Sequence, residues 1–288
     1  MIQFFHPRFI FALLLGIVSF SASGQSLLDE LSTEPAAHEV TATFKDTRVI
    51  NMQSNETPGA GVLHFVIAHR FGRINEGLYS LWGLDNASMR MAFDYGLTDR
   101  WSIGLGRSTF QKTVEASVKG KLLIQKSDNS MPLSLTYYGV TMANGMRWDD
   151  PERDNLFSSR LSFVHQLILT SKLTERTSVA LVPSLTHRNL VSFTSQSHDQ
   201  ITIGIGGRHK LTHRMSVNTE YHLPIQGLND GTTNSLSLGV DIETGGHVFQ
   251  LHITNSQGMF ERAFLTETTG RWLDGDLFFG FNLSRVFS

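Results

Sequence analysis

The chain has 288 residues, of which 40% are hydrophobic and 17% charged, with a formal net charge of −2 and no cysteine. The low charge argues against disorder, the near-neutral balance gives no bias toward nucleic acid, and the missing thiols exclude disulfides and zinc-thiolate sites. After residue 20 no apolar run approaches 18 residues, which excludes a helical membrane span in the mature chain.

The N-terminus has the features of a secretory signal peptide, which we predict at residues 1–24. Arg8 supplies the positive charge, residues 9–20 form the apolar stretch, and residues 22–24 are small enough for cleavage before Gln25. A membrane anchor helix is the alternative, but the apolar run is too short for it. We therefore expect an exported protein.

Residues 25–60 are polar and mixed in character, with one strand-like run at 40–50. They precede a long region in which apolar and polar residues alternate. Two interpretations stay open for them: an N-terminal extension in the periplasm, or a plug folded into the lumen of a barrel.

From residue 61 onward the chain is organised by a repeated turn. The pattern L-T-x-R-x-S-[I/V] begins at Leu97, Leu173 and Leu211, so its copies are 76 and 38 residues apart. Each copy indicates a tight hairpin turn, and the period fits two strands of roughly 10 residues, the length that crosses a bilayer. The alternation predicts strands at 61–70, 87–97, 100–110, 113–125, 132–142, 157–173, 177–188, 200–211, 214–223, 235–243, 247–254 and 276–287.

The predicted fold is all-β: an antiparallel, transmembrane, up-and-down β-barrel of about twelve strands over residues 61–288. An even number of strands returns both termini to one side, which for bacterial outer-membrane barrels is the periplasm. Trp101 lies beside a tight turn, and Trp82, Trp148 and Trp272 lie in longer loops, as expected for two interfacial girdles. A soluble β-sandwich also alternates, but its strands are shorter.

The last strand carries a predicted insertion signal. Phe279, Phe281, Leu283 and Phe287 share one face, which resembles the C-terminal signal by which outer-membrane barrels are recognised for insertion. Arg285 interrupts that face and Ser288 follows the final aromatic residue. The expected partners are therefore outer-membrane lipid and the barrel-insertion machinery, with no nucleic acid.

The chain also resembles an uncharacterised group, the domain-of-unknown-function β-barrel family numbered 5777. The resemblance implies a barrel and supplies no activity, ligand or catalytic residue. It covers most of the mature chain and rests on residues 56–59, 69–73, 83–86, 94–98, 107–113, 247–249, 254–256 and 280–285.

Charged and polar residues fall on the face opposite the apolar one and are predicted to line the lumen, because a Lys or Arg at the bilayer midplane costs about 2–4 kcal/mol. Such a face fits either solute passage or an ion-paired interior that braces the wall. The predicted lumen residues are Arg90, Asp94, Glu115, Lys119, Lys121, Arg160, Arg208, Lys210, Glu220, His222, Asp241 and Glu243.

No motif predicts catalysis or a cofactor. No serine sits in a G-x-S-x-G elbow, and the glycines of 203–207 lie inside a strand with no helix after them, unlike a nucleotide loop. His64, His222 and His252 share the inward face, but scattered polar positions explain them better than a metal site does.

The sequence thus predicts a bacterial outer-membrane barrel that is not an enzyme. Its function is expected to be that of a pore or transporter for small polar or charged solutes. The alternative is a membrane scaffold whose long loops, 71–86 and 255–275, bind a partner. The sequence identifies neither the solute nor a protein partner.

Overall fold

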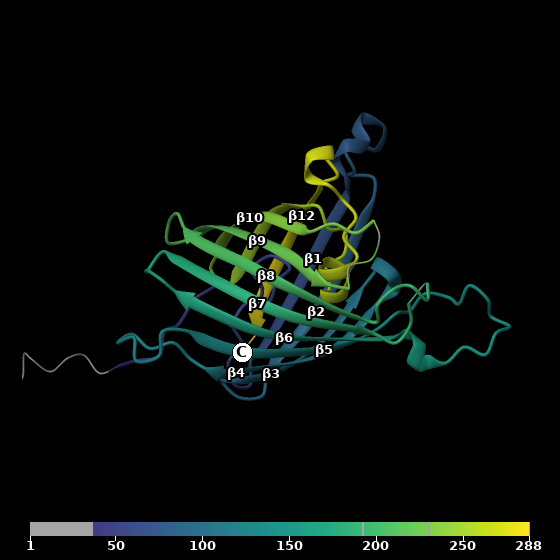
Figure 1. Ribbon diagram of the computed structural model, residues 1–288. Helices are drawn as coiled ribbons and strands as arrows, with labels where there is room; N and C mark the ends of the chain where they lie inside the picture. Colours follow the sequence, from purple (N-terminus) through teal and green to yellow (C-terminus); the bar gives the residue numbers. More distant parts are fainter. Residues whose placement is uncertain (1–36, 192, 228, 230, 288) are drawn as a thin grey trace, which may run out of the picture. The chain divides into compact units, whose positions relative to one another are not determined.

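The computed structural model describes residues 37–191, 193–227, 229 and 231–287, so the predicted signal peptide lies outside the described residues. The described residues from 39 to 287 form one compact unit. Within it the strands close into a barrel in which each strand pairs antiparallel with its neighbours in the chain, and the first pairs with the last (Figure 1).

Twelve strands make up the wall, as the sequence predicts. Two ranges, at 177–188 and 247–254, agree with the prediction at both ends, and most other ends differ by one to three residues. The strands are β1 (Leu63–Arg73), β2 (Ala87–Gly96), β3 (Trp101–Ser108), β4 (Val114–Leu123), β5 (Ser134–Ala143), β6 (Leu161–Lys172), β7 (Thr177–Arg188), β8 (Asp199–Lys210), β9 (Met215–Gln226), β10 (Ser235–Thr244), β11 (His247–Thr254) and β12 (Phe278–Phe287).

The three copies of the repeated motif form the same turn, between β2 and β3, β6 and β7, and β8 and β9. In the second copy the N–H groups of Leu173 and Thr174 donate to the Thr177 carbonyl at 2.9 and 3.2 Å. The Thr174 hydroxyl oxygen accepts N–H bonds from Arg176 and Thr177 at 3.2 and 3.0 Å, and Thr98 and Thr212 do the same in their copies. The hydroxyl satisfies donors that the tight turn leaves unpaired, which explains the repeated threonine.

The outer face of the barrel is apolar. Side chains alternate between exposed and buried along the strands, as in β3 and β9, and the exposed ones include Phe93, Ile103, Leu105, Leu181 and Ile205. Strands of 8 to 12 residues with an apolar outer face match the thickness of a bilayer.

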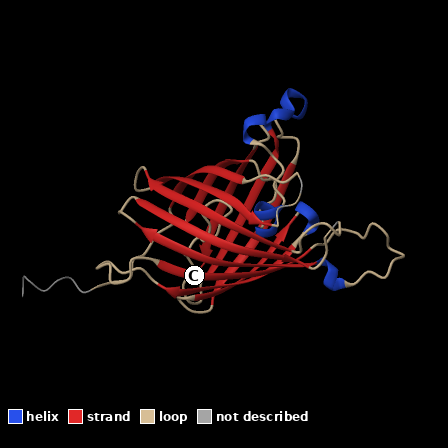
Figure 2. Ribbon diagram, viewed as in Figure 1, coloured by secondary structure: helices blue, strands red, loops and turns tan. Residues whose placement is uncertain are grey.

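The helical elements are short (Figure 2). Across the described parts of the chain, none is long and apolar enough to span a membrane. Among the described residues, four are 3-10 turns: η1 (Ile74–Ser80), η2 (Phe110–Lys112), η3 (Phe157–Arg160) and η4 (Trp272–Asp274); α2 (Glu261–Thr266) is an α-helix. All six residues of α2 are buried, because the β11–β12 loop folds into the barrel.

The strand-like run predicted at 40–50 does not form a strand. In the described part of the segment the structure shows only isolated bridges, Glu39 to Lys126 and Arg48 to Gln53. Its backbone polar groups instead bond to each other and to side chains of the wall, so no ladder forms. We call residues 39–58 the luminal segment.

Candidate functional site: the filled lumen

The luminal segment makes a tight reverse turn inside the barrel. The Val49 N–H donates to the Met52 carbonyl at 2.7 Å, and the Ser54 N–H donates to the Thr47 carbonyl at 3.0 Å. Val49 and Met52 are almost fully buried. The tip of this turn, residues 49–52, is therefore a defined structure presented to the inner wall.

Glu220 of β9 holds the tip. Its carboxylate accepts the backbone N–H groups of Ile50, Asn51 and Met52 at 2.9–3.1 Å, and it also accepts the Asn51 amide at 2.8 Å. The Ser237 hydroxyl adds a further bond at 3.1 Å. Three successive N–H groups that converge on one anion form a nest, which stabilises a fully buried carboxylate without a salt bridge.

Asn51 links Glu220 to a buried arginine. Its amide oxygen accepts a bond from Arg70 at 2.9 Å, while its NH2 group donates to Glu220. Arg70, fully buried on β1, also donates to the carbonyls of Ser256 and Gly258 in the β11–β12 loop at 2.7 and 3.1 Å. One cation thus contacts both the luminal segment and the inward loop.

Other wall residues bind the carbonyls of the luminal segment. Lys119 donates to the Thr47 carbonyl at 2.9 Å, Arg208 to the Thr43 carbonyl at 3.3 Å, and Gln250 to the Val49 carbonyl at 2.6 Å. Each is at least nine-tenths buried. Buried polar groups of wall and segment therefore satisfy one another, as a water-poor interior requires.

Near the end of the barrel where the tight turns lie, ion pairs fasten the segment. Lys45 pairs with Glu243, and Asp46 lies 2.9 Å from the ring of His64. Burial alone would raise the pKa of Asp46, but the charge of His64 and hydrogen bonds to its carboxylate outweigh burial and hold that pKa at about 2.

The remaining predicted lumen residues lie at several places on the wall. Arg90 and Glu115 form a buried, bidentate pair on β2 and β4, with bonds of 2.7–3.2 Å. Asp241 accepts bonds from Ser216 and Gln250 at 3.2 and 2.6 Å, and Asp94 lies 3.7 Å from His64. Lys121 lines a small cavity beside Glu56, and Lys210 is the partly exposed last residue of β8.

Arg160 lies in η3, outside the strand that was predicted to begin at residue 157. That strand begins four residues later, at Leu161, because the chain first makes a 3-10 turn. The Arg160 guanidinium donates to the carbonyls of Asn144 and Met146 and lies 3.8 Å above the ring of Trp148.

The three inward histidines have separate neighbours. His222 packs against the ring of Phe264 at 4.9 Å, His252 lies 3.0 Å from Arg70, and His64 faces Asp46. Within the described ranges no three His, Asp or Glu side chains are placed to hold a metal ion.

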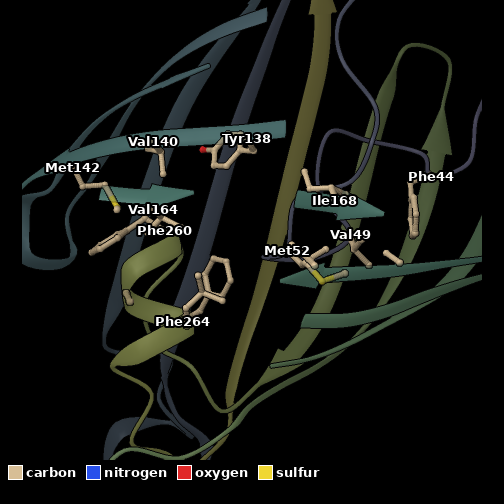
Figure 3. Packing of buried hydrophobic residues seen from close by; sticks show 14 residues of the cluster. Phe44, Val49, Met52, Tyr138, Val140, Met142, Val164, Ile168, Phe260 and Phe264 are labelled. Atoms are coloured by element: carbon tan, nitrogen blue, oxygen red, sulfur yellow. The ribbon is translucent and has the colours of Figure 1, made fainter. Parts of the chain in front are cut away.

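One side of the lumen is apolar, which the sequence reasoning missed. Inward residues of β5, β6 and β7 join a single buried cluster with the luminal segment and α2, where Phe260 lies near Val164 and Met52 near Ile168 (Figure 3). The signal was present: these strands are apolar at inward positions as well as outward ones, for example Val140 and Val182. An apolar inner face needs a cover, because exposure to water is unfavourable.

Glycines of β8 make room for that cover. A Cβ built at Gly206 would overlap Met52 Cε, and one at Gly204 would lie 3.0 Å from Met52 Sδ. Gly204 and Gly206 thus form a socket for the Met52 side chain of the luminal segment. Between segment and wall, a remaining cavity of about 20 Å³ has room for about one water molecule.

The family model described as "Membrane bound beta barrel domain (DUF5777)" matches residues 44–287. The chain belongs to this family. The match begins inside the luminal segment, so the family domain includes most of the residues that fill the barrel. None of the curated proteins has a sequence similar to this chain.

Two porins and an outer membrane channel are among the solved structures similar to this chain. The NanC porin is 7% identical with a TM-score of 0.46, covering 78% of this chain and 98% of its own. The KdgM porin is 8% identical with a TM-score of 0.46, covering 79% and 99%. An outer membrane channel from Pseudomonas putida F1 is 14% identical with a TM-score of 0.48, covering 81% and 97%.

In this membrane-bound barrel the predicted insertion residues lie on the outer face of β12. Phe279, Phe281 and Leu283 are partly exposed, and Phe287 is exposed beneath the guanidinium of Arg285 at 4.8 Å. Phe281 stacks on His69 of β1 at 5.0 Å, across the seam where the first and last strands meet.

Proposed function

We propose that the protein is an outer-membrane barrel, with its tight turns in the periplasm, that passes small polar or charged solutes. The passage is closed while the luminal segment and α2 occupy the lumen, and it opens when they withdraw. The proposed activity is regulated passage, without chemical conversion of the solute.

The observation that supports this proposal is the polar attachment of the luminal segment. Glu220, Lys119, Arg208 and Gln250 are wall residues that bind its backbone, in addition to the bonds that three of them make to other wall residues. If the segment left, these groups would face water and would line a hydrated passage with charges of both signs. If the filling served only to stabilise the wall, apolar side chains would do so better, since a buried charge costs several kcal/mol before it is paired.

The second candidate function is a membrane scaffold that binds a partner through its loops. Of the two loops predicted for this role, only the β1–β2 loop fits it. The β11–β12 loop is largely buried from Asn255 to Thr268, so little of it is available to a partner. The β1–β2 loop instead exposes apolar side chains, with Leu78 at 72% and Tyr79 at 99% exposure.

Planar-bilayer conductance tests the proposal, with heat-modifiable gel mobility as the check that each form folds. The forms are the full mature chain, a variant lacking residues 25–58, and a double variant, Met52→Cys with Gly206→Cys, bridged by a short bis-methanethiosulfonate reagent that forms a disulfide with each cysteine and releases methanesulfinate. We expect rare openings in the full chain, steady conductance after truncation, and closure of the bridged form that reverses on reduction. Absence of conductance in every folded form would reject passage and favour the scaffold.

A further inference from the structure

A cavity of about 540 Å³ lies at the opposite end of the barrel from the tight turns, and we call it the vestibule. Loops after β5 and β7 form its sides, together with Gln111 and the end of α2. The acidic residues of its lining are Asp149 and Glu267. Its basic residues are five arginines: Arg147, Arg153, Arg160, Arg188 and Arg262.

The floor of the vestibule is the attachment of α2. Arg188 and Arg262 both approach one carboxylate, that of Glu267, at 3.4 and 3.6 Å. Arg188 also donates to the Thr266 hydroxyl at 2.6 Å, and Gln111 donates to Glu267 at 3.0 Å. A solute entering from this end therefore meets these groups before it reaches the helix that fills the lumen.

The floor carries more positive charge than its own carboxylate balances. Two guanidinium groups share Glu267; within the described residues the Arg262 Nε faces this carboxylate at 3.6 Å without a hydrogen bond, and the Arg188 Nε is buried without a hydrogen-bond partner. Buried donors of this kind normally have partners. The excess positive charge on the floor favours the binding of a further anionic group.

The sides of the vestibule add exposed cations. Neither Arg147 nor Arg153 has an ion pair or hydrogen bond among the residues the structure describes. Arg160 is fixed by two carbonyls and by Trp148, so one arginine is positioned in advance. The loop also carries Asp150, Glu152 and Asp154, but these acids do not line the cavity.

We propose that the vestibule binds a small solute that carries two or more carboxylate or phosphate groups. Arginine forks match both groups through paired N–H bonds, and the volume lies within the range of small-molecule sites. A bound anion would compete with Glu267 for Arg188 and Arg262 and so loosen α2. This assignment names the solute class of the proposed passage; the binding itself is independent of that proposal, and only the opening of the lumen after binding rests on it.

Intrinsic fluorescence tests binding without any measurement of conduction, because Trp148 lines the vestibule. The full chain in neutral detergent is titrated with citrate and with pyrophosphate, against sodium chloride at matched ionic strength. The matched variants are Arg147→Gln with Arg153→Gln, and Arg176→Gln with Arg214→Gln, two exposed arginines of the distant turns. Trp148→Phe identifies the signal.

We expect a saturable change with citrate or pyrophosphate that weakens about tenfold or more in the Arg147/Arg153 variant and is retained in the turn variant. Absence of a saturable change, or equal weakening in both variants, would overturn the proposal. A change seen only after anionic phospholipid is added would identify a lipid headgroup and overturn the assignment to a solute. If the anion binds but the barrel conducts under no condition, the proposed binding site is supported and the proposed passage of solutes is rejected.

Discussion

Replacement of Glu220 by glutamine tests how the luminal segment is retained. The side chain keeps its size, but one carboxylate oxygen becomes an NH2 group that cannot accept the bonds this oxygen receives. The oxygen nearest the Asn51 amide and Ser237 accepts bonds at 2.8–3.1 Å, and the other oxygen accepts three backbone N–H groups at 2.9–3.1 Å. Glutamine can reproduce only one of these two sets.

The expected cost comes from those contacts. A hydrogen bond to a charged group contributes about 1.5–3 kcal/mol, so losing the smaller set of two bonds shifts the balance toward the open state by about 3 kcal/mol or more. That corresponds to a factor of about 100. Glu243→Gln is the control, because its pair with Lys45 at the rim is partly exposed and contributes about 0–1 kcal/mol.

A single cysteine reports the opening. The natural chain has none, and Ser54 is fully buried in the luminal segment, so Ser54→Cys is a conservative probe. If opening precedes reaction, its labelling rate should rise about 100-fold with Glu220→Gln and little with Glu243→Gln. Equal labelling in folded protein with and without Glu220→Gln would refute the retaining role of Glu220.

Three further predictions concern the turn, the wall and pH. Thr174→Val removes the acceptor of two backbone N–H bonds and should lower the free energy of unfolding by about 1 kcal/mol, measured by urea titration with gel mobility; an unchanged midpoint would contradict this. Gly96→Ala places a Cβ against the Gly59 carbonyl and should speed labelling of the cysteine probe, whereas Gly207→Ala meets nothing closer than 3.8 Å and should not. The pKa of Asp46 is held at about 2, below its ordinary value of 3.8. The stability that Asp46 gives to the closed form is therefore fully present above pH 3.8 and is lost as the pH falls toward 2. Labelling with a pyridyl disulfide should therefore accelerate over that range, and a flat profile would count against the Asp46–His64 contact.

The wall of the barrel is predictable from sequence because its rules are local. Alternation with a period of two assigns Phe93 and Leu105 to the outer face and Glu220 to the inner face, and the exposures agree. The turn threonines recur in the sequence because in every copy the threonine hydroxyl accepts hydrogen bonds from backbone N–H groups of the same turn.

The filling of the lumen depends on contacts that are distant in sequence. Asn51 and Glu220 are 169 residues apart, and no periodicity in either region indicates that they meet. The scaffold alternative makes the loop that carries Phe260 and Phe264 a binding loop for a partner, whereas in the structure both side chains are buried. Strands β5 to β7 carried a signal of this burial, because they are apolar at inward positions as well as outward ones. A membrane wall that is apolar on both faces requires an internal cover.

The two parts that fill the lumen are held to each other as well as to the wall. Glu261 of α2 is fully buried and accepts Arg48 at 2.7 Å and Gln53 at 2.8 Å from the luminal segment. Withdrawal of the segment alone would leave Glu261 buried without a counter-charge, which typically costs about 3–5 kcal/mol. Withdrawal of α2 alone would likewise leave Arg48 without its counter-charge, Glu261. Closure should therefore be cooperative, with the vestibule acting on one end of α2 and the luminal segment acting on the other.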